Sequence, residues 1–182
     1  MEQRIKDANL EELACIVSTA LEEAGITAAL SGGGAVSVYT QNEFESYDLD
    51  FVTLRYIDDV RTVMSALDFD FVVGSRYFTH SQTEFVVEFP TGPLAFGLTE
   101  VDMDETNIRE YLNGVLRIIT PTQAVMDRMA AFYHWNDNQS RQQAIRVIRN
   151  NEIDWSELNA WAEVEGIDRS VIEKLKADSM NG

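Results

Sequence analysis

The sequence predicts an α/β (α+β) fold: a small mixed sheet flanked by helices, with a helical bundle at its C-terminal end. Two observations predict it. Up to about residue 119, apolar runs of strand length alternate with segments whose apolar residues repeat at helical spacing. From Thr120 onwards only helical spacing is found. We therefore divide the chain into an α/β part over residues 1–119 and a helical region, packed on it, over residues 120–182.

In the α/β part, each element follows from a local signal. Asn9 and Glu12 form a capping-box pattern, and apolar residues at helical spacing follow it as far as Gly25. Apolar, β-branched and aromatic runs then predict strands, while wider apolar spacing predicts helices. The expected strands are 27–31, 48–54, 69–73, 77–80, 84–89 and 115–119, and the expected helices between them are 34–40 and a segment around 60–67.

The helical region opens at a clear start signal. Thr120 is a good N-cap, Pro121 suits the first helical position, and Gln123 completes a capping box. Apolar stripes predict one helix that extends to Tyr133 and a second around residues 144–148. A third helix is expected after Asp154 and a short last one over residues 169–176.

Composition bounds the class of protein. The 182 residues are 45% hydrophobic, so a sizeable core is expected and disorder is not. No apolar run reaches the ~20 residues that a membrane helix needs, so we expect no membrane partner. The N-terminus starts no secretory segment, and the single cysteine, Cys15, leaves no intrachain disulfide. These features favour the cytoplasm.

The charge is strongly negative, at −17. It argues against general nucleic-acid binding, because phosphate contacts need Lys and Arg. Two interpretations stay open. In the first, the charge forms a solvated, self-repelling surface that keeps the protein soluble, as is also expected of a protein from a salt-adapted source. In the second, it forms an acidic face on which a protein partner docks.

Two nearby segments carry the chemistry. Segment 30–35 is an apolar strand end followed by a run of three glycines, and Asp48 and Asp50 lie in the next expected strand. Side chains alternate along a strand, so these two carboxylates point the same way, about 7 Å apart at about 3.3 Å per residue. Carboxylate oxygens are the ligands that Mg²⁺ prefers. Glycines at a helix start expose backbone amides that favour a phosphate.

The pattern resembles the nucleotidyltransferase superfamily, most closely its minimal and toxin–antitoxin-associated branches. The residues that carry the resemblance are Gly32 and Gly33, a short helix, and then Ser46-Tyr47-Asp48-Leu49-Asp50-Phe51, over about residues 27–119. The resemblance implies a two-metal site built from about three carboxylates, with Mg²⁺ or Mn²⁺ as cofactor. It also implies that Ser31, Gly32 and Gly33 line the phosphates of a nucleoside triphosphate.

Two further residues are expected to complete the site. Glu88 is the candidate third carboxylate, because it lies inside an apolar strand where a lone charge is costly. Glu84 shares its face and is the fallback. Arg128, at the edge of an apolar helix stripe, matches the basic residue that related proteins place against the nucleotide phosphates. The alternatives are a solvated edge-strand acid for Glu88 and a surface arginine for Arg128.

Other residues are weaker candidates. Arg55 and Arg76 lie near the expected sheet. His80 and His134 have no second histidine at ligand spacing, so a zinc site is not expected, and His134 fits a packed helix end.

The sequence therefore predicts a metal-dependent transferase that moves a nucleoside monophosphate from an NTP such as ATP to a hydroxyl acceptor, which is a small molecule, a protein side chain or an RNA end. The alternative is a degenerate scaffold acting as a binding or regulatory protein, one half of a toxin–antitoxin pair. Segment 41–46 motivates it, since it holds two glutamates and no Lys or Arg where many members place a basic residue. A hydrolase acting on a phosphate ester is a third option.

Overall fold

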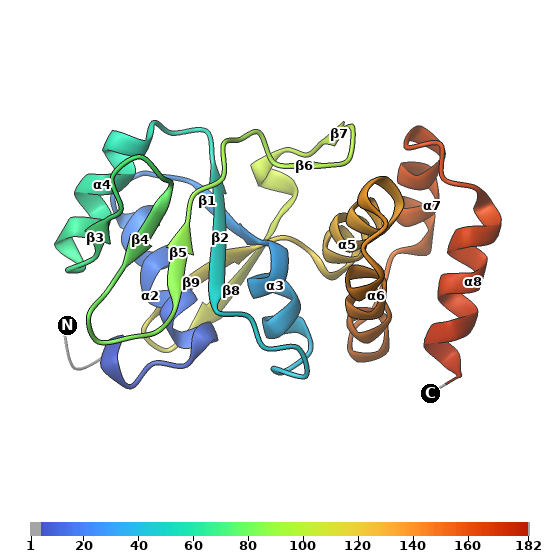
Figure 1. Cartoon of the computed structure of the whole chain (residues 1–182), viewed down its shortest axis with the longest axis horizontal. Coiled ribbons are helices and arrows are strands. Elements are labelled where there is room, and N and C mark those ends of the chain that lie inside the picture. The colour runs from blue at the N-terminus through green and yellow to red at the C-terminus, as the bar shows by residue number, and fades with distance from the viewer. Residues whose placement is uncertain (1–4, 182) are drawn as a thin grey trace.

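The computed structural model describes residues 5–181, and Figure 1 shows an α/β part joined to a helical part. The helices are α2 (Leu10–Glu23), α3 (Gly32–Tyr39), α4 (Ile57–Ala66), the 3-10 turn η1 (Met103–Glu105), α5 (Pro121–Trp135), α6 (Asn138–Asn150), α7 (Trp155–Val164) and α8 (Arg169–Met180). The strands are β1 (Ala28–Ser31), β2 (Asp48–Thr53), β3 (Asp70–Phe71), β4 (Tyr77–Thr79), β5 (Val86–Glu88), β6 (Ala95–Phe96), β7 (Thr99–Glu100), β8 (Asn107–Tyr111) and β9 (Gly114–Ile118).

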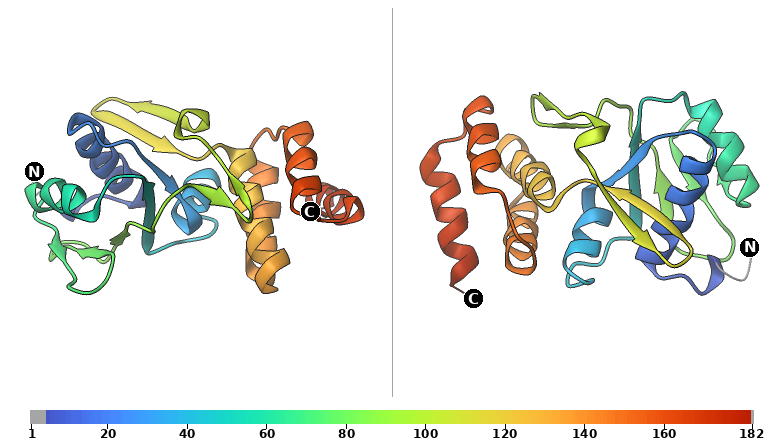
Figure 2. Two further views of the ribbon diagram at one scale, coloured as in Figure 1. Left: turned by 90° about the horizontal axis from the view of Figure 1, so that it is seen from above. Right: turned by 180° about the vertical axis from the view of Figure 1, so that it is seen from behind.

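The main sheet is mixed, with the strand order β3-β4-β5-β2-β1-β9-β8. β2 runs antiparallel to β1 and parallel to β5, and β1 runs parallel to β9. α2 packs on β1 and β9, whereas α3 lies between β2 and the helices α5 and α6 (Figure 2). The mixed sheet flanked by helices confirms the predicted fold class.

One continuous core spans both parts of the molecule. Buried side chains of β1, β2 and β9 belong to the same cluster as those of α5, α6 and α7. Polar bonds tie the parts together as well. The Tyr39 hydroxyl donates to the Ile119 carbonyl at 2.5 Å, and the Asn151 amide donates to the Tyr39 carbonyl at 2.9 Å. The end of α3 is therefore fixed against the helical region.

Both predicted capping boxes are present. The Asn9 side chain accepts from the Glu12 amide, and the Thr120 side chain accepts from the Gln123 amide. The expected helix 34–40 was placed too late, because α3 already begins at Gly32 and the three glycines form its first turn. β8 and the hairpin of β6 and β7 were not expected. Among residues 5–181, no helix combines the length and apolarity needed to cross a bilayer.

The β6–β7 hairpin leaves the main sheet and contacts the helical part. The Trp161 indole donates to the Phe96 carbonyl at 3.0 Å. The Glu165 side chain, with no exposed surface, accepts from the Leu98 amide at 3.0 Å and from the Thr99 hydroxyl at 2.7 Å. Gly97 lies against this carboxylate, since a Cβ on it would be 2.1 Å from Glu165 Oε2. A buried carboxylate thus holds the hairpin tip.

Candidate functional site

A row of polar side chains crosses the middle of the sheet. Asp50 of β2 is the register partner of Ser31 on β1 and of Glu88 on β5. Neighbours in register share a face, while the intervening Leu49 and Val87 are fully buried on the other. The alternation of each strand therefore brings the Asp50 and Glu88 carboxylates to one face, next to the start of α3.

The glycine turn lies directly against Asp50. Gly32 has a φ of +61°, which an L side chain adopts only with strain, and a Cβ on it would be 2.2 Å from Asp50 Oδ2. A Cβ on Gly33 would be 3.0 Å from the hydroxyl of Ser46. At these two positions Asp50 and Ser46 come close to the backbone of α3, because no side chain stands between them.

The surroundings of Asp50 disfavour its charged form. Burial, above all, and then the charge of Glu88 raise its pKa to about 6. Asp48 and Asp127 act in the same direction, and Arg128 opposes them. Negative charge is therefore concentrated around Asp50, with the positive charge of Arg128 opposing it, an arrangement that a cation would relieve.

Glu88 has partners on its outer side. Arg76 Nη2 lies 3.3 Å from Glu88 Oε1, and Arg76 Nη1 donates to the Thr91 hydroxyl at 3.0 Å. The pKa of Tyr77, the register partner of Glu88 on β4, is raised, and the charge of Glu88 is the largest cause. Glu84, the fallback, is exposed and precedes β5, so Glu88 is the glutamate beside Asp50.

Arg128 is held within the helical part of the site. Its Nη2 and Nε donate to Asp127 Oδ2 at 2.6 and 3.1 Å, and its Nη1 donates to Gln143 at 3.3 Å. It is mostly buried, with 17% of its side chain exposed, and it affects the pKa of Asp50. Asp127, which the sequence analysis did not single out, thus adds a carboxylate from α5.

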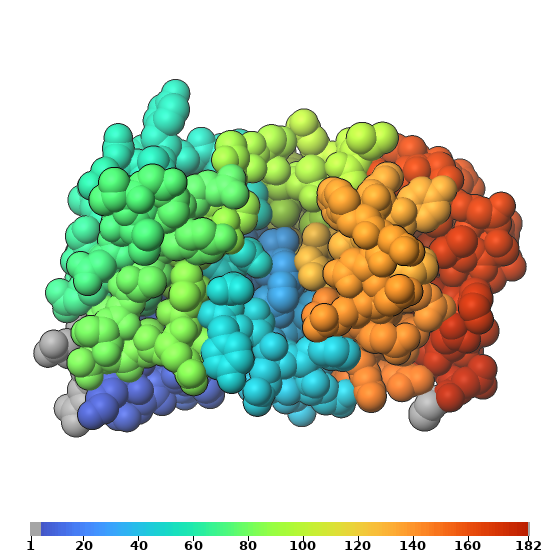
Figure 3. Space-filling model, viewed as in Figure 1, coloured from blue at the N-terminus to red at the C-terminus, as the bar shows by residue number. Residues whose placement is uncertain are grey.

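Figure 3 shows a hollow in the molecular surface between the α/β part and the helices α5 and α6, with the segment of β1 and α3 at its floor. Ser31, the N-cap residue of α3, is buried and makes no side-chain capping bond. The Ser46 hydroxyl bonds both the carbonyl and the amide of Asp48 and fixes the turn into β2. These contacts place Ser31, Gly32 and Gly33 beside the two aspartates.

The donor chemistry suits a hard divalent cation, since Asp48, Asp50 and Glu88 offer only carboxylate oxygens. They do not form a complete metal-binding group in this structure. Within residues 5–181, no three His, Cys, Asp or Glu side chains lie close enough together to hold a metal ion. Asp48 is exposed, and Glu88 is paired with Arg76. The three carboxylates thus fit such an ion in chemistry and strand register, and in this structure their side chains do not converge on one point.

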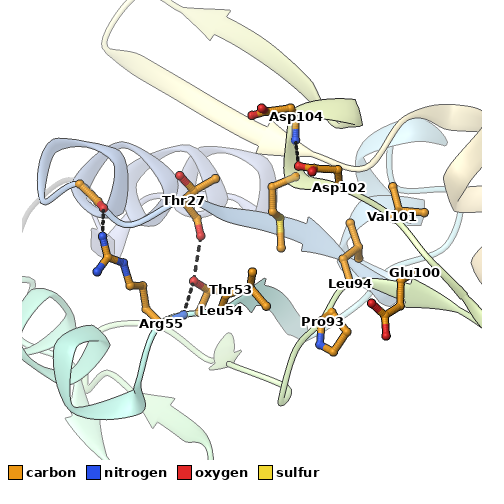
Figure 4. A pocket seen from close by; sticks show the side chains of 12 residues that line it. Thr27, Thr53, Leu54, Arg55, Pro93, Leu94, Glu100, Val101, Asp102 and Asp104 are labelled. Atoms are coloured by element: carbon orange, nitrogen blue, oxygen red, sulfur yellow. Dashed lines mark hydrogen bonds between the residues drawn. The ribbon is translucent and has the colours of Figure 1, made fainter.

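Arg55, a weaker candidate, lies elsewhere. It donates from Nη2 to the Gly25 carbonyl at 3.2 Å and borders a cavity of about 430 Å³ between the end of β2, β7 and η1 (Figure 4). That cavity is at the Thr53 end of β2, whereas Asp48 begins the strand. His134 lies in the last turn of α5, with Nε2 3.3 Å from Glu165, and it is exposed, which differs from the packed position that the sequence suggested.

Comparisons with known proteins are sparse. No protein-family model and no curated protein sequence matches this chain. One similar solved structure is the solution structure of the antibiotic-resistance factor ANT(2'')-Ia, with 12% identity over 90% of this chain and 92% of that chain, at a TM-score of 0.47. At this identity and TM-score, the similar course of the two chains carries no information about activity.

Proposed function

We propose that this protein is a metal-dependent nucleotidyltransferase, which moves a nucleoside monophosphate from an NTP to a hydroxyl acceptor. The observation that carries the proposal is the register of Asp50 with Glu88 on neighbouring parallel strands, with Gly32 against Asp50. Carboxylates on one face beside an open helix start are what a metal-bound phosphate chain needs.

The residues have distinct roles in this proposal. Asp48, Asp50 and Glu88 hold Mg²⁺ or Mn²⁺, and the bound cation supplies charge neutralisation to the phosphates. The backbone amides of Gly32 and Gly33 line the phosphate chain. The acceptor oxygen forms a bond to the α-phosphorus, the bond to the β-phosphate oxygen breaks, and pyrophosphate leaves.

Three side chains assist this transfer. The Glu88 carboxylate takes the proton of the acceptor hydroxyl. Arg128 neutralises charge on the phosphates from the α5 side, in exchange for part of its contact with Asp127. Ser31 adds a hydroxyl at the start of α3.

Calorimetric titration of ATP, GTP, CTP and UTP in the presence of Mg²⁺ tests the proposal. The wild type is compared with the double variant Asp48→Asn, Asp50→Asn and with a control, Asp58→Asn, Asp59→Asn. The control removes the same two charges from the exposed first turn of α4. We expect metal-dependent binding in the wild type and the control, and none in the site variant.

Absence of NTP binding at millimolar concentration, or equal binding by the site variant, would contradict the proposal. It would favour a binding or regulatory protein on the same scaffold. Segment 41–46 supports that alternative, since it has no basic residue and its Glu43 pairs with Arg146 at 3.1 Å. Co-purification of this protein with a basic protein, as the two halves of a toxin–antitoxin pair, would support that alternative.

A further inference from the structure

Arg76 bridges the outer side of the candidate site. Its two terminal nitrogens contact Glu88 Oε1 at 3.3 Å and the Thr91 hydroxyl at 3.0 Å. Its own backbone is fixed as well, since the Phe89 amide donates to the Arg76 carbonyl at 3.1 Å. The guanidinium is therefore held against Glu88, which is the third carboxylate of the candidate site and the last residue of β5.

The ion pair with Arg76 involves one of the three carboxylates proposed to hold the metal. Within residues 5–181, Glu88 forms an ion pair and neither Asp48 nor Asp50 does. The Glu88 side chain is 15% exposed, whereas that of Arg76 is 50% exposed. The carboxylate is thus fixed in the strand, and the cationic partner is the one with room to leave.

We propose that Arg76 competes with the divalent cation for Glu88, and so sets the metal affinity of the site. This inference rests on the proposed function. Without metal, the guanidinium neutralises Glu88 and holds it away from the two aspartates. When the cation binds, Glu88 exchanges Arg76 for the metal, and Arg76 keeps its bond to Thr91 or turns to solvent.

Two physical effects support the competition. A metal that takes Glu88 has to replace an existing ion pair, and it is also repelled by the nearby guanidinium of Arg76 until that side chain turns away. A partly exposed pair contributes little on its own, which keeps the exchange readily reversible. Removing the guanidinium is therefore expected to tighten metal binding by about 3- to 10-fold.

The test measures Mn²⁺ binding without nucleotide, from the electron paramagnetic resonance signal of free Mn²⁺. Arg76→Gln is compared with Arg61→Gln, which removes the same charge from an exposed ion pair on α4. Arg76→Lys retains the charge on a side chain that cannot bridge Glu88 and Thr91. Thr91→Val removes only the anchor of Arg76. Thermal denaturation without metal checks that each variant folds.

We expect Arg76→Gln to bind Mn²⁺ about 3- to 10-fold more tightly than the wild type, Arg76→Lys and Thr91→Val to lie in between, and Arg61→Gln to match the wild type. Unchanged or weaker binding by Arg76→Gln would overturn the inference, and weaker binding would mean that Arg76 orients Glu88 for the metal. If Arg76→Gln does not fold, Thr91→Val decides by the same criterion.

Asp50→Asn separates this inference from the proposed function. Loss of Mn²⁺ binding in Asp50→Asn, together with equal affinities for Arg76→Gln and Arg61→Gln, would overturn the inference and leave the proposed site intact. No Mn²⁺ binding by the wild type, or undiminished binding by Asp50→Asn, would remove the metal site itself and the inference with it.

Discussion

Replacement of Gly32 by alanine tests the close approach between the start of α3 and Asp50. The change has two costs. The residue has a φ of +61°, where a side chain costs about 1–2 kcal/mol. The new Cβ would also lie 2.2 Å from Asp50 Oδ2, so the carboxylate has to move, which costs about 1–3 kcal/mol more.

Gly25 supplies the control for the backbone cost. It has a φ of +72°, and a Cβ on it would meet nothing within 4 Å. Gly25→Ala is therefore expected to lose about 1–2 kcal/mol of unfolding free energy, and Gly32→Ala about 2–5 kcal/mol. Urea denaturation of both variants measures the difference, which isolates the contact with Asp50.

A double-mutant cycle sharpens the experiment. In an Asp50→Ala background the clashing carboxylate is gone, so Gly32→Ala should cost only as much as Gly25→Ala. The Mn²⁺ affinity of Gly32→Ala should fall, because Asp50 is displaced, while that of Gly25→Ala should not. Equal unfolding costs for the two glycine variants, or a Gly32 cost that persists without the Asp50 side chain, would refute the reasoning.

Two further predictions concern the partly buried Asp50 and the buried Glu165. Because the pKa of Asp50 is raised to about 6 in the folded protein, its contribution to stability is present below about pH 4 and is lost as the pH rises through 6. Asp50→Asn should therefore be about 2–3 kcal/mol more stable than the wild type at pH 8 without divalent cations, and no more stable at pH 4, as urea denaturation at both pH values will reveal. Glu165→Gln should lower the unfolding free energy by about 2–4 kcal/mol, because it weakens a buried set of bonds to Leu98, Thr99 and His134. Exposed Glu163 on the same helix is the control, since Glu163→Gln should lie within about 0.5 kcal/mol of the wild type in thermal denaturation.

Local signals predicted the parts of the fold that depend on neighbours in sequence. The capping boxes at Asn9 and Thr120 are such signals, because each joins residues three apart. The shared face of Asp50 and Glu88 also follows from alternation once the strands pair in register. The choice of Glu88 over Glu84 needed the extent of β5, which starts only at Val86.

The rest depends on tertiary partners that no local pattern reveals. β8 has a polar sequence, and its Arg109 and Tyr111 side chains both pair with Glu11 of α2, a hundred residues away in the chain. Apolar alternation could not predict such an edge strand. Asp127 was overlooked for a similar reason, since its importance lies in holding Arg128 near Asp50. Its position beside Arg128 was the available signal.

The hairpin of β6 and β7, whose tip is bound by Glu165, limits how far the helical part can move away from the sheet. Residues 94–101 act as a brace from the sheet to α7, in addition to the covalent connection at Thr120. A rigid-body rotation of the helical part away from the sheet would break the bonds between the hairpin tip and the buried Glu165 carboxylate, which is costly. If the proposed nucleotide binds in the hollow between the α/β part and the helices α5 and α6, it is therefore expected to enter by rearrangement of side chains such as Arg128 while the helical part keeps its position relative to the sheet.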